Sequence, residues 1–299
     1  MAPPSLQVQT VLYGNPPGDV ERFVGSMAVA AARARAAGAV GQVSLAIGDC
    51  SPAPVLDRAA IVARHGPAFD RVDYVHFGEN LGSAGGHNRL FGSLAADVAI
   101  VSNADGYASP LLVTELLAPL GDPDVGIVEA RQVPLEQPKA HDPTTGDTSW
   151  ASGSCLAVRA EVVEATGGFD PSLFFLHLDD VDFSWRVRLA GWRVVHRPAA
   201  AFFHDKRLGP AGDLQASDAE LRHSAEAWVL LPWRYSRRDV AEVMLARLQA
   251  SGDPRFREAA ERLLERQRAG DLPEPIDPEG RVAMFALPHY AFAPHRFTW

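Results

Sequence analysis

The sequence predicts an α/β fold in which helices cover both faces of a mainly parallel sheet. Short apolar runs alternate with longer segments of helical periodicity over the first two thirds of the chain, and this alternation is typical of strand-helix-strand units. With 299 residues, the chain can bury roughly three quarters of its extended surface. Its composition, 47% hydrophobic and 22% charged, is that of a folded globular protein.

Four apolar runs in the first half have the length and composition of strands, and a helical pattern follows each. The predicted strands cover residues 6–12, 42–47, 72–77 and 98–101, and the predicted helices cover residues 20–37, 53–64, 83–95 and 110–118. Ser109 can cap the fourth helix, with Pro110 at its first position. Ligands bind at the carboxyl ends of the strands in such sheets, so the segments that follow the strands are where we expect a site.

The pattern changes in the remaining chain. Residues 129–149 show no apolar periodicity, which predicts a long loop, and long ordered loops are usually functional. Two further strands are predicted at 193–196 and 200–203, before three helices at 216–231, 238–250 and 254–269. We therefore expect an α/β part over residues 1–210, followed over residues 211–299 by a helical C-terminal subdomain with an aromatic, proline-rich tail.

Charge and cysteine content exclude several classes of protein. The net charge of −9 argues against a nucleic-acid partner, because that binding needs a basic surface. Cys50 and Cys155 are too few for a disulfide framework and lack metal-ligand spacing. The first residues lack the basic start and apolar core of a signal peptide, and no apolar run approaches the ~20 residues that span a bilayer. We expect a cytoplasmic protein, at most peripheral on the inner face of the membrane.

A glycine-rich segment from Asn80 to Asn88, with Gly82 and Gly86, joins a predicted strand to a predicted helix. Free backbone N–H groups and the helix dipole favour an anion at such a junction, so the segment could contact a diphosphate. The alternative is a turn in which glycine lets the helix approach the sheet closely. Glycine clusters are weak signals, so the residues alone leave both interpretations open.

Two candidate metal ligands follow predicted strands. Asp105 comes just after the strand at 98–101, where a carboxylate can hold a divalent cation that also binds phosphates. The alternative is that Asn103, Asp105 and Gly106 simply form a turn. His204 follows the strand at 200–203 and could complete the metal shell, although a lone histidine is more often structural.

The acidic run Asp179-Asp180-Val181-Asp182 starts a predicted helix. Acids in a first turn complement the helix dipole, and that electrostatic role is the plain explanation. Carboxylates packed this closely also raise one another's pKa values, which suits a general base. The local sequence alone favours the first interpretation.

Four segments, in this order and at these spacings, resemble glycosyltransferase family 2, whose members have the GT-A fold. They are WASGSCLAVR at 150–159, GGFD at 167–170, LDDVDFSWR at 178–186 and AGWRVV at 190–195. The resemblance extends over residues 8–204. It implies a Rossmann-like, mainly parallel sheet flanked by helices.

The resemblance implies a role for each matching residue. Asp180 matches the catalytic base that deprotonates the acceptor hydroxyl, and Asp179 matches the acid before it, an acceptor contact. Asp105 matches the last acid of the family's metal-binding Asp-x-Asp motif, although Asn103 stands at the first position. His204 matches the family's metal-binding histidine, so Asp105 and His204 would hold Mn²⁺ or Mg²⁺.

Further matches concern the donor and the acceptor. Asp49 lies where the family holds the nucleobase, and Tyr13 follows the first predicted strand. The implied donor-binding set is Tyr13, Asp49, Asn80, Gly82, Gly86, Asn88, Asn103 and Asp105, and the implied sugar- or acceptor-binding set is Trp150, Gly153 and Asp179.

These placements imply a metal-dependent, inverting glycosyltransferase that moves a sugar from a nucleotide-diphosphate donor to a glycan or lipid-linked acceptor. Similarity to rhamnosyl- and galactofuranosyl-transferases favours a deoxysugar or furanose donor. One alternative is a nucleotidyltransferase, but no glycine-rich signature with a following basic residue lies near the N-terminus. Another is a carbohydrate-binding relative without activity, against which Asp105, Asp180 and His204 speak.

One segment suggests a membrane partner. Residues 228–235, WVLLPWRY, combine aromatics with charge and precede Arg237 and Arg238, and such a surface could lie on a membrane beside a lipid-linked acceptor. The alternative is that these apolar residues pack against the α/β part or a second subunit of a homodimer.

Overall fold

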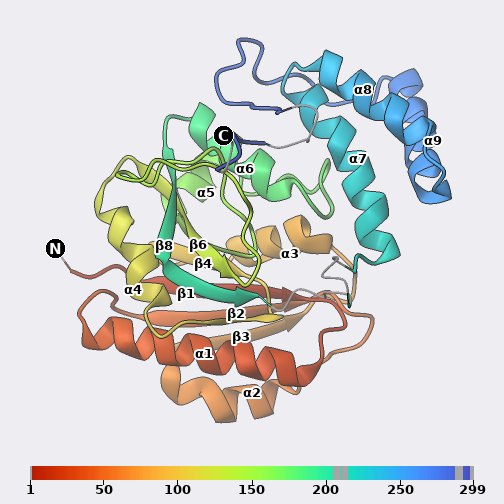
Figure 1. Cartoon of the computed structure of the whole chain (residues 1–299). Helices are drawn as coiled ribbons and strands as arrows, with labels where there is room; N and C mark the ends of the chain where they lie inside the picture. The colour runs from red at the N-terminus through yellow and green to blue at the C-terminus, as the bar shows by residue number, and fades with distance from the viewer. Residues whose placement is uncertain (1, 205–209, 211–214, 287–291, 297–299) are drawn as a thin grey trace.

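The computed structural model describes residues 2–204, 210, 215–286 and 292–296. Over these residues the chain forms an eight-stranded sheet in the order β3-β2-β1-β4-β7-β6-β8-β5. Helices cover both faces of the sheet, and a further group of helices stands at one side (Figure 1). The predicted α/β class is confirmed.

The sheet combines two parallel groups of strands. The strands are β1 (Leu6–Leu12), β2 (Val43–Asp49), β3 (Arg71–His76), β4 (Val98–Ser102), β5 (Gly106–Ala108), β6 (Val125–Val133), β7 (Cys155–Arg159) and β8 (Arg193–His204). Strands β3, β2, β1 and β4 are parallel, as are β6 and β8. Strand β7 runs antiparallel to both β4 and β6 and so joins the two groups, while β5 pairs antiparallel with the end of β8.

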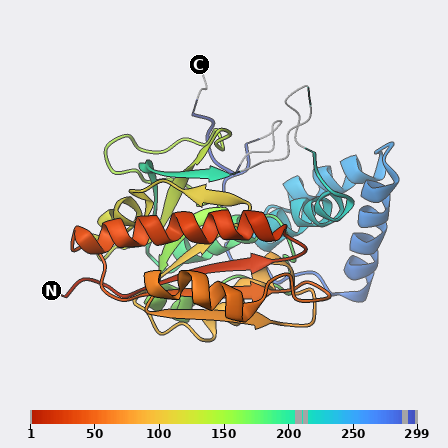
Figure 2. The same cartoon turned by 90° about the horizontal axis from the view of Figure 1, so that it is seen from below.

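Helices form two layers and a separate group. They are α1 (Pro17–Ala36), α2 (Arg58–His65), α3 (Gly82–Phe91), α4 (Leu112–Leu117), α5 (Ala160–Thr166), α6 (Asp179–Leu189), α7 (Asp218–Arg234), α8 (Arg238–Gln249) and α9 (Pro254–Ala269). Helices α1, α2 and α4 cover one face, and α3, α5 and α6 cover the other (Figure 2).

Strand β4 shows why the sheet needs both layers. Val98 and Ile100 belong to the apolar cluster beneath α1, whereas Ala99 and Val101 belong to the cluster beneath α5 and α6. Successive side chains of a strand point to opposite faces, so an uninterrupted apolar run must be covered on both sides. The run of apolar residues in β4 therefore dictates a central strand.

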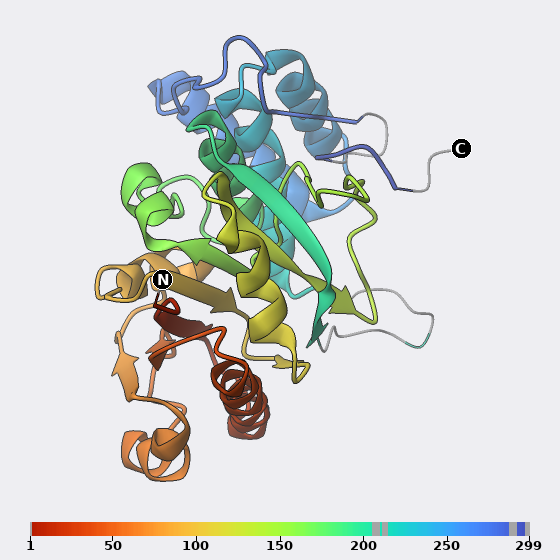
Figure 3. The same ribbon diagram turned by 90° about the vertical axis from the view of Figure 1, so that its left-hand side faces the viewer.

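The helical C-terminal part shares its core with α6. Trp185 of α6 packs edge-on against Tyr235, with ring centroids 4.8 Å apart, inside a cluster that includes buried residues of α7, α8 and α9. Figure 3 shows these helices gathered beside α6. The predicted boundary between residues 210 and 211 falls among residues outside the described part, so the division into two parts stays a prediction.

Two predicted elements differ from those observed. Residues 129–133 belong to β6 rather than to a loop, because they pair with β8 and most are buried. The two strands predicted at 193–196 and 200–203 form the single strand β8, with an irregularity opposite Ala130 and Arg131 where Pro198 interrupts the pairing. Proline cannot donate to a strand ladder, so a bulge at this point lets the strand continue.

The aromatic segment at 228–235 is largely internal. Leu230, Leu231 and Tyr235 are buried in the cluster shared with α6, and the Trp228 ring lies beside Phe256. This arrangement agrees with the alternative in which the apolar residues pack against the rest of the protein. Few of these apolar side chains are then exposed where they could contact a membrane. In the part of the chain that the structure describes, no helix is long and apolar enough to cross a bilayer.

Asp182 ties the C-terminal helices to α6 and provides a test of the fold. Its side chain is fully buried, 2.8 Å from the Arg186 guanidinium and 3.0 Å from that of Arg234. Removing one partner of a buried ion pair leaves an uncompensated charge, so Asp182→Asn should lower the free energy of unfolding by about 3–5 kcal/mol in urea titrations.

The matched control is Asp239→Ala, whose ion pair with Arg237 is exposed to solvent. Exposed pairs contribute little, so this change should alter stability far less. Equal losses in the two variants would show that Asp182 does not hold the helices to α6.

Candidate functional site

A cleft of about 740 Å³ opens between the carboxyl ends of β4, β6 and β8, the start of α6, helix α7 and the C-terminal tail. It brings together seven of the residues selected from the sequence, which are Asn103, Asp105, Trp150, Gly153, Asp179, Asp180 and His204. The acidic run and the metal-ligand candidates therefore face one cavity, as the rule for ligand sites in open α/β sheets predicts.

Asp180 is held in a fixed orientation at the first turn of α6. The Gly153 N–H donates to its Oδ2 at 2.9 Å, and the Val181 N–H donates to its Oδ1 at 2.8 Å. Burial raises the pKa of Asp180, although the Gly153 hydrogen bond and the Lys139 charge oppose that shift. A carboxylate with a raised pKa, oriented by a backbone N–H and open to a cleft, is suited to accept a proton.

The chain reaches this helix through strained backbone. His177 and Leu178 have φ values of 67° and 59°, a left-handed conformation that is costly for residues with side chains and that concentrates at functional sites. Asp179 is largely buried at the wall of the cleft, where its carboxylate accepts a hydrogen bond from Ser83. Burial and the adjacent Asp180 charge raise the pKa of Asp179, so the two neighbouring acids oppose each other's ionisation.

A second polar group lies at the ends of β4 and β8. His204 Nε2 is 3.2 Å from Asp105 Oδ1 and 3.3 Å from Asn103 Nδ2, and His204 Nδ1 is 3.2 Å from Gln132 Oε1. The Gln132 side-chain oxygen is an acceptor and therefore suits the tautomer with hydrogen on Nδ1, in which the lone pair of Nε2 is available to the Asn103 amide or to a cation. Among the described residues, no three histidine, cysteine or acidic side chains converge as a metal site.

The glycine-rich segment supports the acidic run through packing. The Ser83 N–H donates to the Phe175 carbonyl at 3.1 Å, and Gly82 approaches that carbonyl so closely that a Cβ would lie 2.2 Å from the oxygen. Gly86 packs against Val11 of β1, where a Cβ would lie 2.7 Å from a methyl group. These contacts agree with the alternative in which glycine lets the helix approach the sheet closely. Of this segment only Ser83 lines the cleft.

Asn88 and Asn80 both bond to backbone groups, Asn88 to a distant segment and Asn80 within its own turn. The Asn88 side chain donates to the Phe169 carbonyl at 2.7 Å and accepts from the Phe169 N–H at 2.9 Å, which holds the glycine turn at 167–168. Asn80 accepts from the Gly82 N–H at 3.1 Å. Neither asparagine lines the cleft.

The remaining two donor candidates lie at the ends of β1 and β2, outside the cleft lining. Asp49 is fully buried and accepts hydrogen bonds from the Ser51 and Val55 N–H groups and the Tyr74 hydroxyl. Burial would raise its pKa, but these hydrogen bonds lower it below the ordinary value. The Asp49 carboxylate thus stabilises the loop that follows β2. The Tyr13 side chain is 57% exposed, so its ring is accessible for stacking against a ligand.

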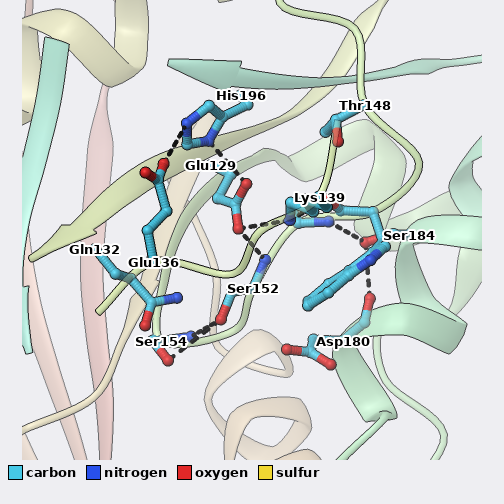
Figure 4. A network of polar contacts seen from close by, with 12 residues as sticks. Glu129, Gln132, Glu136, Lys139, Thr148, Ser152, Ser154, Asp180, Ser184 and His196 are labelled. Atoms are coloured by element: carbon cyan, nitrogen blue, oxygen red, sulfur yellow. Dashed lines mark hydrogen bonds and ion pairs between the residues drawn. The ribbon is translucent and has the colours of Figure 1, made fainter. Parts of the chain in front are cut away.

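A buried network of charges beside the cleft, in which Lys139 also belongs to the cleft lining, was not identified from the sequence. Lys139 Nζ lies 2.7 Å from Glu129 Oε1, and Glu129 Oε2 lies 2.9 Å from His196 Nδ1 (Figure 4). The other ring nitrogen, Nε2, is 2.9 Å from Glu136 Oε1. The available signal was Glu129 itself, an acid that directly follows the apolar residues 125–128 of β6.

No family model matches the chain. The chain is 28% identical over 278 residues to the N-acetylglucosaminyl-diphospho-decaprenol L-rhamnosyltransferase of two Mycobacterium tuberculosis strains. The alignment covers 77% of this chain and 85% of the relative.

Solved structures resemble the chain in fold. A mannosyltransferase of Pyrobaculum calidifontis, in complex with GDP-Man and Mn²⁺, superposes on this chain with a TM-score of 0.52 at 17% sequence identity. The superposition covers 89% of this chain and 80% of the mannosyltransferase chain. GalNAc-T7 with UDP, GalNAc and Mn²⁺ has a TM-score of 0.59 at 13% identity, covering 90% of this chain and 56% of its own. The comparisons confirm the GT-A fold and the resemblance to glycosyltransferase family 2.

The contacts of Asn88 predict a structural role. Asn88→Ala removes both hydrogen bonds to Phe169 and should lower the free energy of unfolding by about 1–3 kcal/mol. The KM for the donor should stay near the unmutated value, because the side chain does not line the cleft. Urea titration and steady-state kinetics check this, and a raised KM with unchanged stability would return Asn88 to the donor site.

Proposed function

We propose that this chain, a glycosyltransferase of the GT-A fold, transfers a sugar from a nucleoside-diphosphate donor to an acceptor hydroxyl with inversion at the anomeric carbon. One observation carries the proposal: the oriented carboxylate of Asp180 and the Asp105–His204 pair line the same cleft. The first group suits an acceptor hydroxyl, and the second suits a divalent cation that would bind the diphosphate of the donor.

The transfer is a single displacement. Asp180 accepts the proton of the acceptor hydroxyl while that oxygen attacks the anomeric carbon from the face opposite the diphosphate. The bond between the anomeric carbon and the phosphate oxygen breaks, and the nucleoside diphosphate leaves with the electron pair. Attack and departure on opposite faces invert the anomeric centre. The Gly153 N–H keeps Asp180 Oδ2 in place throughout, which is the preorganisation that such proton transfer needs.

The residues at the ends of β4 and β8 fit a divalent cation. Asp105 Oδ1 and His204 Nε2 lie 3.2 Å apart, so with Nε2 deprotonated both atoms could bind one cation. Carboxylate and imidazole suit Mn²⁺, and a carboxylate with phosphate oxygens suits Mg²⁺. When bound, the cation would offset the negative charge that develops on the departing diphosphate.

The acceptor proposed is a lipid-linked glycan, and the donor proposed is a nucleotide deoxysugar such as a rhamnose donor. The Mycobacterium tuberculosis relative is named for both an L-rhamnosyl group and a diphospho-decaprenol acceptor. On the α7 side, the cleft is lined by apolar side chains such as Leu221 and Phe292, which suit the apolar part of such an acceptor. The protein would then work peripherally at the inner face of the membrane.

A donor panel tests the proposed reaction. The purified protein is incubated with nucleotide sugars, Mn²⁺ and lipid-linked acceptor extract, and nucleoside diphosphate release is measured. We expect turnover of a deoxysugar donor, loss of turnover with a chelator, and weaker activation by Mn²⁺ in His204→Ala. If no donor in the panel is turned over, the transferase proposal fails; if the chelator has no effect, the metal assignment fails.

Asp180→Asn tests the base. The amide cannot accept the acceptor proton, so kcat should fall on the order of 10²- to 10⁴-fold, while the dissociation constant for the donor stays the same in a calorimetric titration. Asp179→Asn is the matched control, because Asp179 is bonded to Ser83 and should lose much less activity. Near-normal turnover in Asp180→Asn would remove Asp180 as the base.

A further inference from the structure

The cleft wall beside Asp180 is a short backbone segment, residues 150–153, and each of its four residues is held by a different group. The Trp150 carbonyl accepts from Lys139 Nζ at 2.6 Å, and the Ala151 N–H donates to Ser184 Oγ at 3.0 Å. The Ser152 N–H donates to Glu129 Oε1 at 2.8 Å. The next N–H, that of Gly153, is the one that orients Asp180.

Glu129 is the common partner behind this segment. Its carboxylate is 2% exposed and contacts Lys139, the Ser152 N–H and His196. Lys139, itself 7% exposed, links the same carboxylate to the Trp150 carbonyl and lies over the Trp150 ring, 3.7 Å from its centroid. Figure 4 shows Glu129 between Lys139, His196 and Ser152, with Asp180 beyond Ser152.

We propose that Glu129 is a positioning residue for the transfer, which holds the 150–153 segment so that the Gly153 N–H points at the Asp180 carboxylate. The inference rests on the proposed function, because it assumes that Asp180 is the base. Glu129 does not touch the reactants, since the segment lies between it and the cleft. It acts through two consecutive peptide groups, those that carry the Ser152 and Gly153 N–H donors.

The energetics of buried ion pairs favour this role over a purely stabilising one. Removing a carboxylate and an ammonium from water costs more than their attraction commonly returns, and apolar replacements of similar volume are often neutral or stabilising. A buried Glu129–Lys139 pair is therefore a poor source of stability. It provides charged hydrogen-bond partners at fixed points, and two of these points are backbone groups of the cleft wall.

Two variants separate positioning from stability. Glu129→Met removes the acceptor of the Ser152 N–H and leaves Lys139 unpaired, so both stability and activity should fall. In the double variant Glu129→Met and Lys139→Met, both charges are gone, and the urea midpoint should recover toward that of the unmutated protein. Because Lys139 also lines the cleft, kcat is compared with that of Lys139→Met alone; it should be lower than in that variant, on the order of 100-fold for a displaced catalytic group, since the Ser152 N–H still lacks its acceptor.

The pH profile gives a readout that a purely structural role would not move. A hydrogen bond to the charged form lowers a carboxylate pKa, so a misdirected Gly153 N–H should shift the acidic limb of kcat/KM upward in the double variant. The other ionisable groups that act on Asp180 are Asp179, Lys139 and His177. Lys139→Met alone removes the Lys139 charge and keeps Glu129. The pH profile of kcat/KM in this single variant therefore shows how much of the shift comes from the lost Lys139 charge.

Asp277→Asn is the control for lost stability, since Asp277 is fully buried and, among the described residues, its side chain accepts hydrogen bonds from the 281–283 backbone, outside the cleft lining. It should lower the urea midpoint and leave the acidic limb in place. A kcat in the double variant equal to that of Lys139→Met, or an acidic limb no higher than that of Lys139→Met, would overturn the inference. If Asp180→Asn is itself active, the proposed base fails instead, and the two failures are thereby distinguished.

Discussion

The first turn of α6 carries three aspartates within four residues, and keeping these charges inside the protein is the constraint on which the surrounding structure depends. Each acid is held by a different part of the chain: Asp179 by Ser83 of α3, Asp180 by Gly153 of the cleft wall, and Asp182 by Arg186 and Arg234. The helix dipole favours the acids only partly. Their partners come from the sheet layer on one side and the C-terminal helices on the other.

The cleft follows from this arrangement. Because α6 is held between the sheet and α7, its acidic start faces the ends of β4 and β8, where Asp105 and His204 lie. The distribution of exposure matters for the chemistry: Asp182 is fully buried and paired, whereas Asp180 keeps one side open to the cavity. The same helical turn therefore contains one acid that stabilises the fold and another that is free to accept a proton.

The charged network of Glu129, Lys139 and His196 is also held inside the protein by partners from different parts of the chain. Glu129 and Lys139 are both buried, Lys139 as part of the cleft lining, and they contact the backbone segment that carries the Gly153 donor. Arg296 of the C-terminal tail reaches Glu136, which lies beside His196. The tail, the sheet and the cleft wall are thus connected through side chains that sit outside the family motifs.

The sequence by itself determined the α/β class, most helices and strands, and seven residues of the cleft, because apolar periodicity and ordered motifs are local signals. It did not determine which groups hold the acids of the run, that residues 129–133 join the sheet, or that Asp49 and Asn88 bind neighbouring backbone instead of facing the cleft. These outcomes depend on partners distant in the chain, such as Arg234 for Asp182 and β8 for β6. Only the tertiary structure decides which polar group finds a partner and which is left facing the cleft.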